Sequence, residues 1–337
     1  MMEPRDLFAR ALIRRTRQEA ERRERDLLSP SATRSADTRG RTIPEEPDPY
    51  RTAFERDRDR ILHSKAFRRL KHKTQVFINP DGDHFVTRLT HTLQVTQIGR
   101  SLAVTLGLNE PLTEAICLGH DVGHAPFGHI GEDALTLFVA GEWHHAAQSI
   151  RVFEVLEPLN LTWEVRDGIR SHSWKIDPPP ATPEGMVCRF ADRIAYLTHD
   201  VDDAVRAEVI RYRDLPSEAT DVLGESGSEW IGSMIEAVAG ESVRTGEVSI
   251  DAAHLDAMNA LRDFMFDRVY LRAEVGDQRD EVITIIRDLV DHYRAHPEEV
   301  PDSYRHHGAN AMTAAIDYVS GMTDRFAIRD HQRLAAI

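Results

Sequence analysis

Apolar residues recur at helical spacing along most of the chain from Tyr50 onward. The main series are Ile61, Leu62, Ala66 and Leu70; Leu89, Leu93, Val95, Ile98 and Leu102; and Ile116, Leu118 and Val122. Because residues three and four positions apart share one face of a helix, these series predict amphipathic helices around a common core. Long alternating runs are absent, and residues 243–251 form the one plausible hairpin fragment. The pattern predicts an all-α protein.

Breaks in this pattern divide the chain. Residues 1–48 join a charged helical stretch to a polar, proline-containing arm, which we expect to pack on another subunit, to lie over the main body or to be mobile. Three consecutive prolines make residues 175–185 a loop, after which helix resumes. Residues 215–250 read as an irregular excursion, and three or four more helices are expected in the tail from Ala253 to Leu334. The expected organisation is an arm at 1–48 and a helical domain at 49–337, with the chemistry in 84–205 and C-terminal helices at 253–337.

Length and charge bound the function. A chain of 337 residues with 41% hydrophobic residues buries a sizeable core. The formal net charge of -14 argues against general affinity for nucleic acid, which depends on Lys and Arg neutralising phosphates. Residues Arg51 to Lys73 nevertheless carry nine Lys or Arg against three acids. This segment is either a solvated helix face with i,i+4 ion pairs or a contact for an anion.

Other features exclude whole classes of protein. The first ten residues lack the apolar core of a signal peptide, and no run approaches the roughly 20 apolar residues of a membrane span. We therefore expect a cytoplasmic protein without membrane contact. Cys117 and Cys188 each lie in an apolar run, and two cysteines are too few for a disulfide framework or a thiolate metal site. Two buried, inert thiols are expected.

Candidate chemistry concentrates in residues 118–133, "LGHDVGHAPFGHIGED". On a continuous helix, His120 and His124 would stack on one face, with Asp121 about 100° around from His120. The following "APFG" breaks the helix, so His129 and Glu132 return toward the same place from a turn. For His129, bracing that turn and touching a substrate are equally open.

Two further segments carry matching groups. "HFVTRLTHTLQV" places His91 on an amphipathic helix with Arg88 one turn earlier, and "RFADRIAYLTHD" places Asp192 on another, followed by Tyr196 and Asp200 on the same face. Two histidines and two aspartates from three helices suit a divalent metal cation. Nitrogen and oxygen donors without sulfur do not distinguish Mg, Mn, Fe, Ni, Co or Zn. Such a metal would lower the pKa of bound water and polarise a phosphoryl oxygen.

The order of His91, His120-Asp121 and Asp192 resembles that of the HD-domain metal-dependent phosphohydrolases. The blocks "RDRDRILHSKAFRRLKHKTQVF", "RLTHTLQVTQIGRSLA", "GHDVGHAPFGHIGE", "FADRIAYLTHDVDDA" and "DYVSGMTDRFA" are similar to the bacterial deoxynucleoside triphosphate triphosphohydrolases, the dGTPase-like branch. The similarity extends from about residue 28 to about residue 327.

The resemblance implies roles residue by residue. The implied metal ligands are His91, His120, Asp121 and Asp192. The implied proton-transfer groups are His124, Glu132 and a histidine from "EWHHAAQS". Anchored on Gln148, that histidine is His145, with His144 and Ala146 in place of the family's usual acid and Asn, which leaves the local hydrogen bonding open. The implied phosphate contacts are Arg88 and Arg193, and the implied deoxyribose contacts are Gln75, Asp200 and Tyr196.

The implied reaction is attack of water at the α-phosphorus of a deoxynucleoside triphosphate (dNTP), which releases deoxynucleoside and tripolyphosphate. The resemblance also implies a homo-oligomer, commonly a hexamer, and a second dNTP as effector. Two alternatives remain: an HD phosphohydrolase for another nucleotide, either a monophosphate or a signalling nucleotide, and a sensor that binds a nucleotide or single-stranded nucleic acid. The sequence predicts neither the preferred base nor the effector site.

Overall fold

The computed structural model describes residues 14–77, 84–224, 227–270, 276–305 and 308–336. These residues form helices joined by loops, as the sequence predicts. Within them, the β-type pairings outside helices are two isolated bridges, Arg41 with Thr162 and Thr74 with Thr87. No helix in this part of the chain has the length and apolar character needed to cross a membrane.

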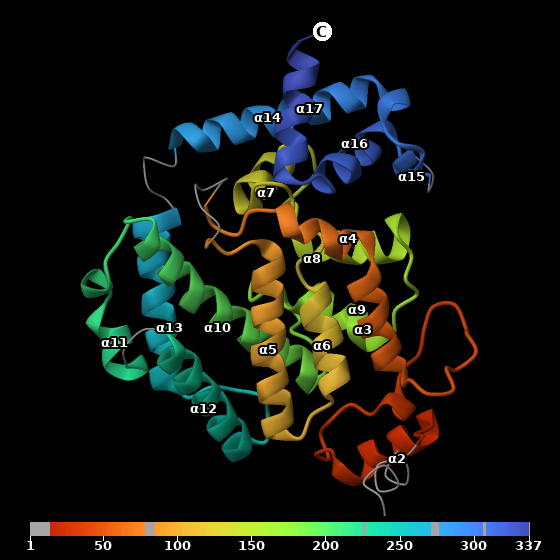
Figure 1. The fold of residues 1–337 in the computed structure, drawn as a ribbon, viewed down its shortest axis with the longest axis vertical. Helices are drawn as coiled ribbons and strands as arrows, with labels where there is room; N and C mark the ends of the chain where they lie inside the picture. The colour runs from red at the N-terminus through yellow and green to blue at the C-terminus, as the bar shows by residue number, and fades with distance from the viewer. Residues whose placement is uncertain (1–13, 78–83, 225–226, 271–275, 306–307, 337) are drawn as a thin grey trace, which may run out of the picture.

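A central group of helices carries most of the residues singled out by the sequence, and Figure 1 shows how these helices are arranged. Its members are α3 (Ala53–His63), α4 (Lys65–Arg69), the short turn η2 (Leu70–His72), α5 (Arg88–Leu106), α6 (Glu110–Gly119), α8 (His145–Arg151), η3 (Val152–Leu156), α9 (Trp163–Ser171) and α10 (Pro183–Arg206). Helix α5 packs against both α6 and α10. Thr87, Asn109 and Thr182 start these three helices by accepting a backbone N–H in the first turn. Cys117 and Cys188 are free and buried in this core, as expected.

Residues 207–270 pack on one side of this group and correct two predictions. They form η4 (Tyr212–Asp214), α11 (Ser217–Leu223), α12 (Ser228–Thr245), α13 (Ala252–Met265) and the π-helical turn η5 (Phe266–Tyr270). The predicted irregular excursion is wrong because Trp230, Met234 and Val238 recur every four residues and bury one face of α12. The hairpin is also wrong, because α12 continues to Thr245 and ends at Gly246 with a positive φ of 82°.

The C-terminal helices build a second core with α7 (Gly128–Thr136) (Figure 1). They are α14 (Gly276–Ala295), the turn η7 (Pro297–Glu299), the short α15 (Asp302–Arg305), α16 (Ala311–Ser320) and α17 (Asp324–Ala335). Helix α14 packs against α7, α16 and α17. Helix α7 overlaps the end of the histidine-rich segment at 118–133. The second core therefore packs against the part of the chain that carries the candidate site.

The N-terminal arm lies over the main body. It begins with α2 (Arg17–Leu27) and contains the turn η1 (Ser35–Asp37). Three buried acids of the body hold it: Glu184 accepts from Thr33, Glu164 accepts from Thr38, and Asp57 pairs with Arg41. Of the three arrangements expected for the arm, residues 14–48 thus adopt the one in which it lies over the main body.

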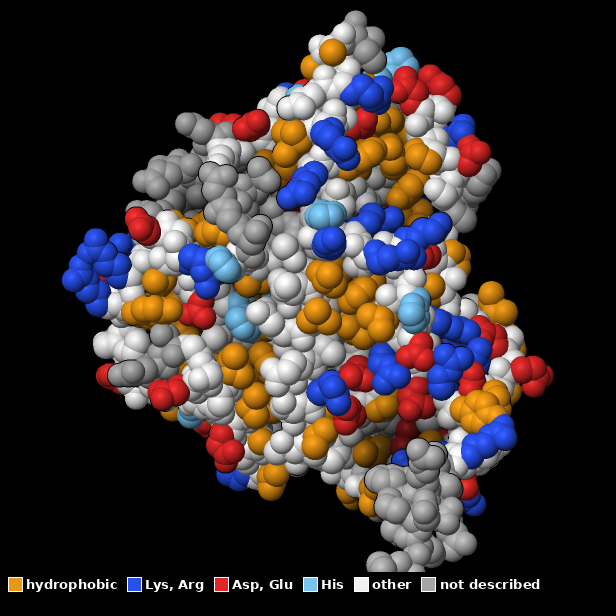
Figure 2. Space-filling view, viewed as in Figure 1, with side chains coloured by type: hydrophobic (Ala, Val, Ile, Leu, Met, Phe, Trp, Pro, Cys, Tyr) orange, Lys and Arg blue, Asp and Glu red, His pale blue; other side chains and the backbone are white. Residues whose placement is uncertain are grey.

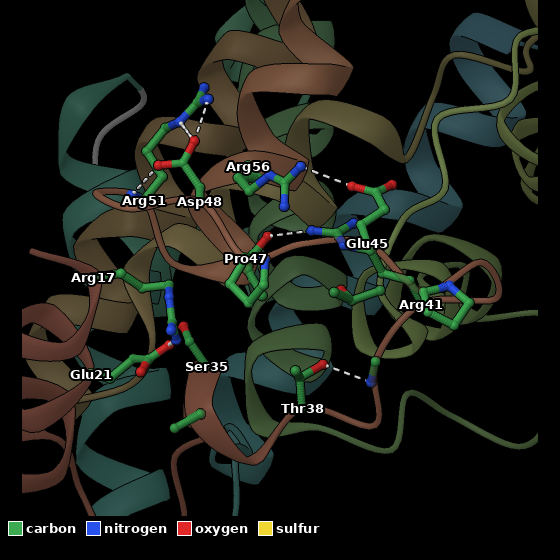
Figure 3. A pocket seen from close by; sticks show the side chains of 15 residues that line it. Arg17, Glu21, Ser35, Thr38, Arg41, Glu45, Pro47, Asp48, Arg51 and Arg56 are labelled. Carbon is green, nitrogen blue, oxygen red and sulfur yellow. Dashed lines mark hydrogen bonds and ion pairs between the residues drawn. The ribbon is translucent and has the colours of Figure 1, made fainter.

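A pocket of about 470 Å³ lies between α2, the arm and α3 (Figure 3). Four arginines line it, and each pairs with an acid: Arg17 with Glu21, Arg41 with Asp57, Arg51 with Asp48, and Arg56 with Glu45. The first part of the basic segment is therefore neutralised, mostly by acids outside its own helix rather than by i,i+4 neighbours.

Candidate active site

The four predicted metal ligands lie together at the meeting point of α5, α6 and α10. His91 Nε2 lies 3.1 Å from Asp192 Oδ1, and His120 Nε2 lies 3.7 Å from the same oxygen. Asp121 Oδ1 lies 3.4 Å from His120 Nε2. His91, His120 and Asp121 are buried. Donor atoms of His91, His120 and Asp192 fall within 4.8 Å of one another, a spacing that one ion can span.

The hydrogen bonding of His120 fits a cation. Its Nδ1 lies 2.6 Å from the carbonyl oxygen of Cys117, so Nδ1 carries a hydrogen, and in the neutral ring Nε2 presents a lone pair. This buried Nε2 has no hydrogen-bond partner among the described residues and faces two carboxylates. Burial opposes a charge on the ring, but Asp121 and Asp192 raise the pKa of His120 to about 10. Anionic and neutral donors directed at one point are the environment of a bound metal ion.

Local geometry at His120 differs from the helix predicted there. Helix α6 ends at Gly119, and residues 120–123 form a turn, so His120 and His124 do not share a regular helix face. The turn docks on α8: Ser149 Oγ accepts the N–H of Gly123 and donates to the carbonyl oxygen of His120, both at 2.9 Å. A Cβ at Gly123 would lie 2.2 Å from Ser149 N. Glycine is required here because two backbones meet.

A second cluster adjoins the first and contains the three predicted proton-transfer residues. His145 Nδ1 lies 2.9 Å from Glu132 Oε1, and His124 Nδ1 lies 2.6 Å from the same oxygen, although not aligned for a hydrogen bond. Burial would raise the pKa of Glu132, but the two imidazoles hold it well below its ordinary value. Burial also holds the pKa of His124 far below normal, with Arg88 and His145 adding to the effect. These directions favour the carboxylate form of Glu132 and the neutral form of His124.

Arg88 borders the metal cluster, and its Nη2 donates to the backbone carbonyl oxygen of Gln75 at 3.4 Å. Arg88 Nη1 donates to Asp121 Oδ2 at 3.0 Å, and Arg88 Nε donates to the carbonyl oxygen of Thr74 at 2.9 Å. Gln75 is buried, and its side-chain oxygen has no partner in the described residues. A guanidinium and an unsatisfied amide oxygen beside a candidate metal offer contacts for a phosphate and a hydroxyl.

The C-terminal core holds the loop that carries His124. Lys73 Nζ donates to the carbonyl oxygens of His124 and Ser320. Asp324 accepts the N–H groups of Thr74 and Phe127 at 2.9 and 3.0 Å. Neither Lys73 nor Asp324 was singled out by the sequence analysis, although both fall within its family-like blocks.

Asp200 lies on one side of the metal cluster, and one of its two carboxylate oxygens accepts a hydrogen bond. Its Oδ2 accepts from Tyr270 Oη at 2.7 Å, and its buried Oδ1 has no partner in the described residues. Burial raises the pKa of Asp200 to about 7 and that of Tyr196 to about 12. Tyr270 was missed, because it reaches the site from the π-helical turn η5, which no helical periodicity reveals.

Arg193 is directed elsewhere. Its Nη2 donates to Asn259 on α13, and its guanidinium lies 5.1 Å from the ring centre of Trp174. In the described residues it has no ion pair with the metal cluster, and its Nε has no hydrogen-bond partner, so its predicted phosphate contact stays a prediction. His129 is exposed, with its ring edge against His124, which leaves both of its predicted roles open.

His172 is a further buried histidine of the site that the sequence analysis did not single out. It follows α9, and its ring lies 5.0 Å from that of His120 and 5.1 Å from that of His145, centre to centre. A single histidine in "RSHSW" gives no signal by spacing, because no second candidate residue recurs near it on the same helix face.

Comparisons with known proteins identify the family of the chain. Residues 88–197 match the HD domain family, and residues 248–333 match the phosphohydrolase-associated domain family. A deoxyguanosinetriphosphate triphosphohydrolase-like protein of Caldanaerobacter subterraneus subsp. tengcongensis is 44% identical over 95% of this chain and 96% of its own length. Another with that name, from Clostridium perfringens, is 44% identical over 94% of this chain and 97% of its own. A solved structure of a hypothetical protein from Aquifex aeolicus covers 81% of this chain and 67% of its own, with 20% identity and a TM-score of 0.48.

Proposed function

The chain belongs to the deoxyguanosinetriphosphate triphosphohydrolase-like family of HD-domain phosphohydrolases, and we propose that it hydrolyses dNTPs to deoxynucleoside and tripolyphosphate. One observation carries the proposal: Asp121 joins two clusters. Its Oδ2 faces Arg88 at 3.0 Å and His91 at 3.9 Å, whereas its Oδ1 lies 3.4 Å from His120 and from His124. One carboxylate therefore contacts Arg88, two of the implied metal ligands and the implied proton acceptor His124.

The metal would be held by His91, His120, Asp121 and Asp192. When bound, a divalent cation supplies Lewis acidity toward a phosphoryl oxygen and lowers the pKa of bound water. The ion's identity stays open among the first-row metals and Mg, since the donors are nitrogen and oxygen.

The chain's own groups would perform the remaining steps. Arg88 is fixed by Asp121 and Thr74 and would offset charge that accumulates on the α-phosphate. His124, kept neutral, would accept a proton of the attacking water, and His145 would donate one to the departing 5′-oxygen. Glu132 contacts both rings and would balance the charge as it moves between them.

Sugar selection would come from Gln75, Asp200 and Tyr196. The free oxygens of Gln75 and Asp200 would accept or share the 3′-hydroxyl proton, with Tyr196 against the ring. A site built to pair one hydroxyl and to exclude another discriminates by orders of magnitude. Arg193 would contact the phosphates with the nitrogens that Asn259 does not engage.

Product analysis tests the proposal. Metal-reconstituted protein is incubated with each of the four dNTPs, with their mixture and with GTP, and products are separated by chromatography. Deoxynucleoside and tripolyphosphate from dNTPs, with little turnover of GTP, are expected. Monophosphate or inorganic phosphate as the main product would instead favour an HD hydrolase for another nucleotide. Activity in the mixture that exceeds the sum of the single reactions would reveal the dNTP effector, and light scattering of the same sample would test for a homo-oligomer.

One observation favours contact with single-stranded nucleic acid as a second function. The cations Lys65, Arg68, Arg69, Lys71, Arg325 and Arg329 have no carboxylate within 4 Å in the described residues, unlike the first part of the basic segment. Figure 2 shows Lys and Arg side chains gathered over α4 and α17 on one face. Anisotropy of a labelled oligothymidine should show binding that weakens steeply with salt. Binding that is absent at low salt, or equal after charge reversal of Lys71 and Arg325, would reject this function.

A further inference from the structure

His172 occupies a position in the site that the proposed mechanism does not use. Its side chain is 1% exposed, and its ring lies between those of His120 and His145. A buried histidine is commonly a core residue with satisfied hydrogen bonds, and a packing role is the simplest alternative. The partners of its two nitrogens decide between that role and a functional one.

The first nitrogen fixes the tautomer. His172 Nδ1 lies 2.8 Å from the carbonyl oxygen of Ile169, one turn earlier at the end of α9. A carbonyl oxygen only accepts, so Nδ1 carries the hydrogen and, in the neutral ring, Nε2 presents a lone pair. Helix α9 therefore determines which nitrogen of His172 faces the site.

The second nitrogen meets His145. His172 Nε2 lies 3.1 Å from His145 Nε2, and two imidazole nitrogens at that distance share one hydrogen. Since His172 Nε2 is the acceptor, His145 Nε2 is the donor. The other nitrogen of His145 faces Glu132 Oε1 at 2.9 Å. Both nitrogens of His145 are thereby assigned partners, and its ring plane is fixed in the stack with His124.

We propose that His172 is a positioning residue that accepts the Nε2–H of His145 and so keeps a hydrogen, rather than a lone pair, on the nitrogen of His145 that lies nearest Asp121. His145 Nε2 lies 3.9 Å from Asp121 Oδ1, so this hydrogen stands beside the place where the phosphate would bind. The inference rests on the proposed function, in which His145 is the proton donor. In this proposal His172 acts through His145; its ring also lies beside His120, and donor atoms of His120, Asp121 and His172 fall within 4.8 Å of one another.

Two substitutions separate this role from packing. His172→Phe keeps a planar ring of similar size without an acceptor, and His172→Gln offers an amide oxygen near the position of Nε2. His254→Phe is the matched control, since His254 is a partly buried histidine on α13 that contacts Asp251 and Ser233, both outside the site.

The experiment measures kcat and KM with a dNTP, metal content, and the imidazole N–H resonances of the metal-free protein by NMR. His172→Phe should lower kcat about 10- to 100-fold, below the full range for loss of a general acid, with KM within about twofold and metal retained. His172→Gln should recover most of kcat. In the NMR spectrum, the His145 Nε2–H resonance should be shifted downfield in the wild type and the Gln variant and lost in the Phe variant.

Four results would overturn the inference: an unchanged kcat in His172→Phe, an effect on KM alone, a folded Gln variant as impaired as the Phe variant, or a His145 N–H signal indifferent to His172. If the wild type makes no tripolyphosphate, the proposed function fails instead, and the NMR comparison still decides whether His172 holds the hydrogen of His145.

Discussion

The imidazoles of His124 and His145 stack face to face, with ring centres 3.9 Å apart and planes at 12°. One comes from the loop before α7 and the other from the first residue of α8. Both Nδ1 atoms face Glu132 Oε1, so both Nε2 atoms are on the side of Asp121. Under the proposed function, the stack would separate two roles that the sequence places in one short segment: holding a metal and moving protons.

That separation predicts different outcomes for two histidines four residues apart. His120→Ala should lose bound metal and activity, because His120 Nε2 is a potential metal-ligand atom that has no hydrogen-bond partner in the described residues and faces Asp121 and Asp192. His124→Ala should retain the metal and lose turnover. Elemental analysis of purified protein, beside initial rates, measures both. Equal metal loss in the two variants would show that His124 belongs to the metal shell.

Glu132→Gln should lower kcat by about 10²- to 10⁴-fold, the usual contribution of general acid–base groups, while the fold and metal content persist. The amide keeps the size of the side chain but removes the negative charge that both imidazoles contact. Glu142→Gln, at an exposed position near the same helix, is the control and should leave the rates unchanged. A Glu132 variant with normal kcat would remove this carboxylate from the mechanism.

Asp200 predicts a pH-dependent stability difference. Burial raises its pKa from 3.8 to about 7, so its contribution to folding is fully present below about pH 4 and is lost as pH rises through about 7. Asn does not titrate and still accepts from Tyr270. Urea unfolding of metal-free protein should therefore show that the Asp200→Asn variant gains stability relative to the wild type as the pH rises from about 5 to about 8. A difference that is constant with pH would contradict the buried, proton-binding carboxyl.

Gly123→Ala should destabilise the fold by about 3 kcal/mol or more, the upper range for overpacking, because the new Cβ would meet backbone atoms of α8. Any relief would move α8 and with it His145. Gly240→Ala is the matched control, since a Cβ at Gly240 in α12 meets nothing within 4 Å, and should stabilise by about 0.5–1 kcal/mol. Thermal unfolding of both variants measures the contrast, and a neutral Gly123 variant would show that the turn is not clamped on α8.

The helical class was readable from the sequence because apolar spacing and N-terminal caps agree, as at Thr87 before α5 and Thr182 before α10. The spacing failed at 215–250, where glycines and polar residues dilute the four-residue repeat that begins at Trp230. It also extended a helix through His120–His124, where the backbone turns because Gly123 docks on Ser149.

The cluster of His91, His120, Asp121 and Asp192 was predictable because a metal site needs few residue types and the family-like blocks fix their order. Its surroundings were not. Tyr270 and His172 approach from segments whose spacing to the site carries no regularity, and the direction of Arg193 depends on Asn259, a contact across two helices. Side-chain partners of this kind are set by packing, which spacing along the chain does not encode.

The most direct test of the account follows oxygen from water into product. Hydrolysis of a dNTP in water enriched in oxygen-18 should place one labelled oxygen in tripolyphosphate and none in the deoxynucleoside, because water attacks the α-phosphorus and the 5′-oxygen leaves. Label in the 5′-hydroxyl of the deoxynucleoside, or labelled monophosphate or pyrophosphate in place of tripolyphosphate, would contradict it.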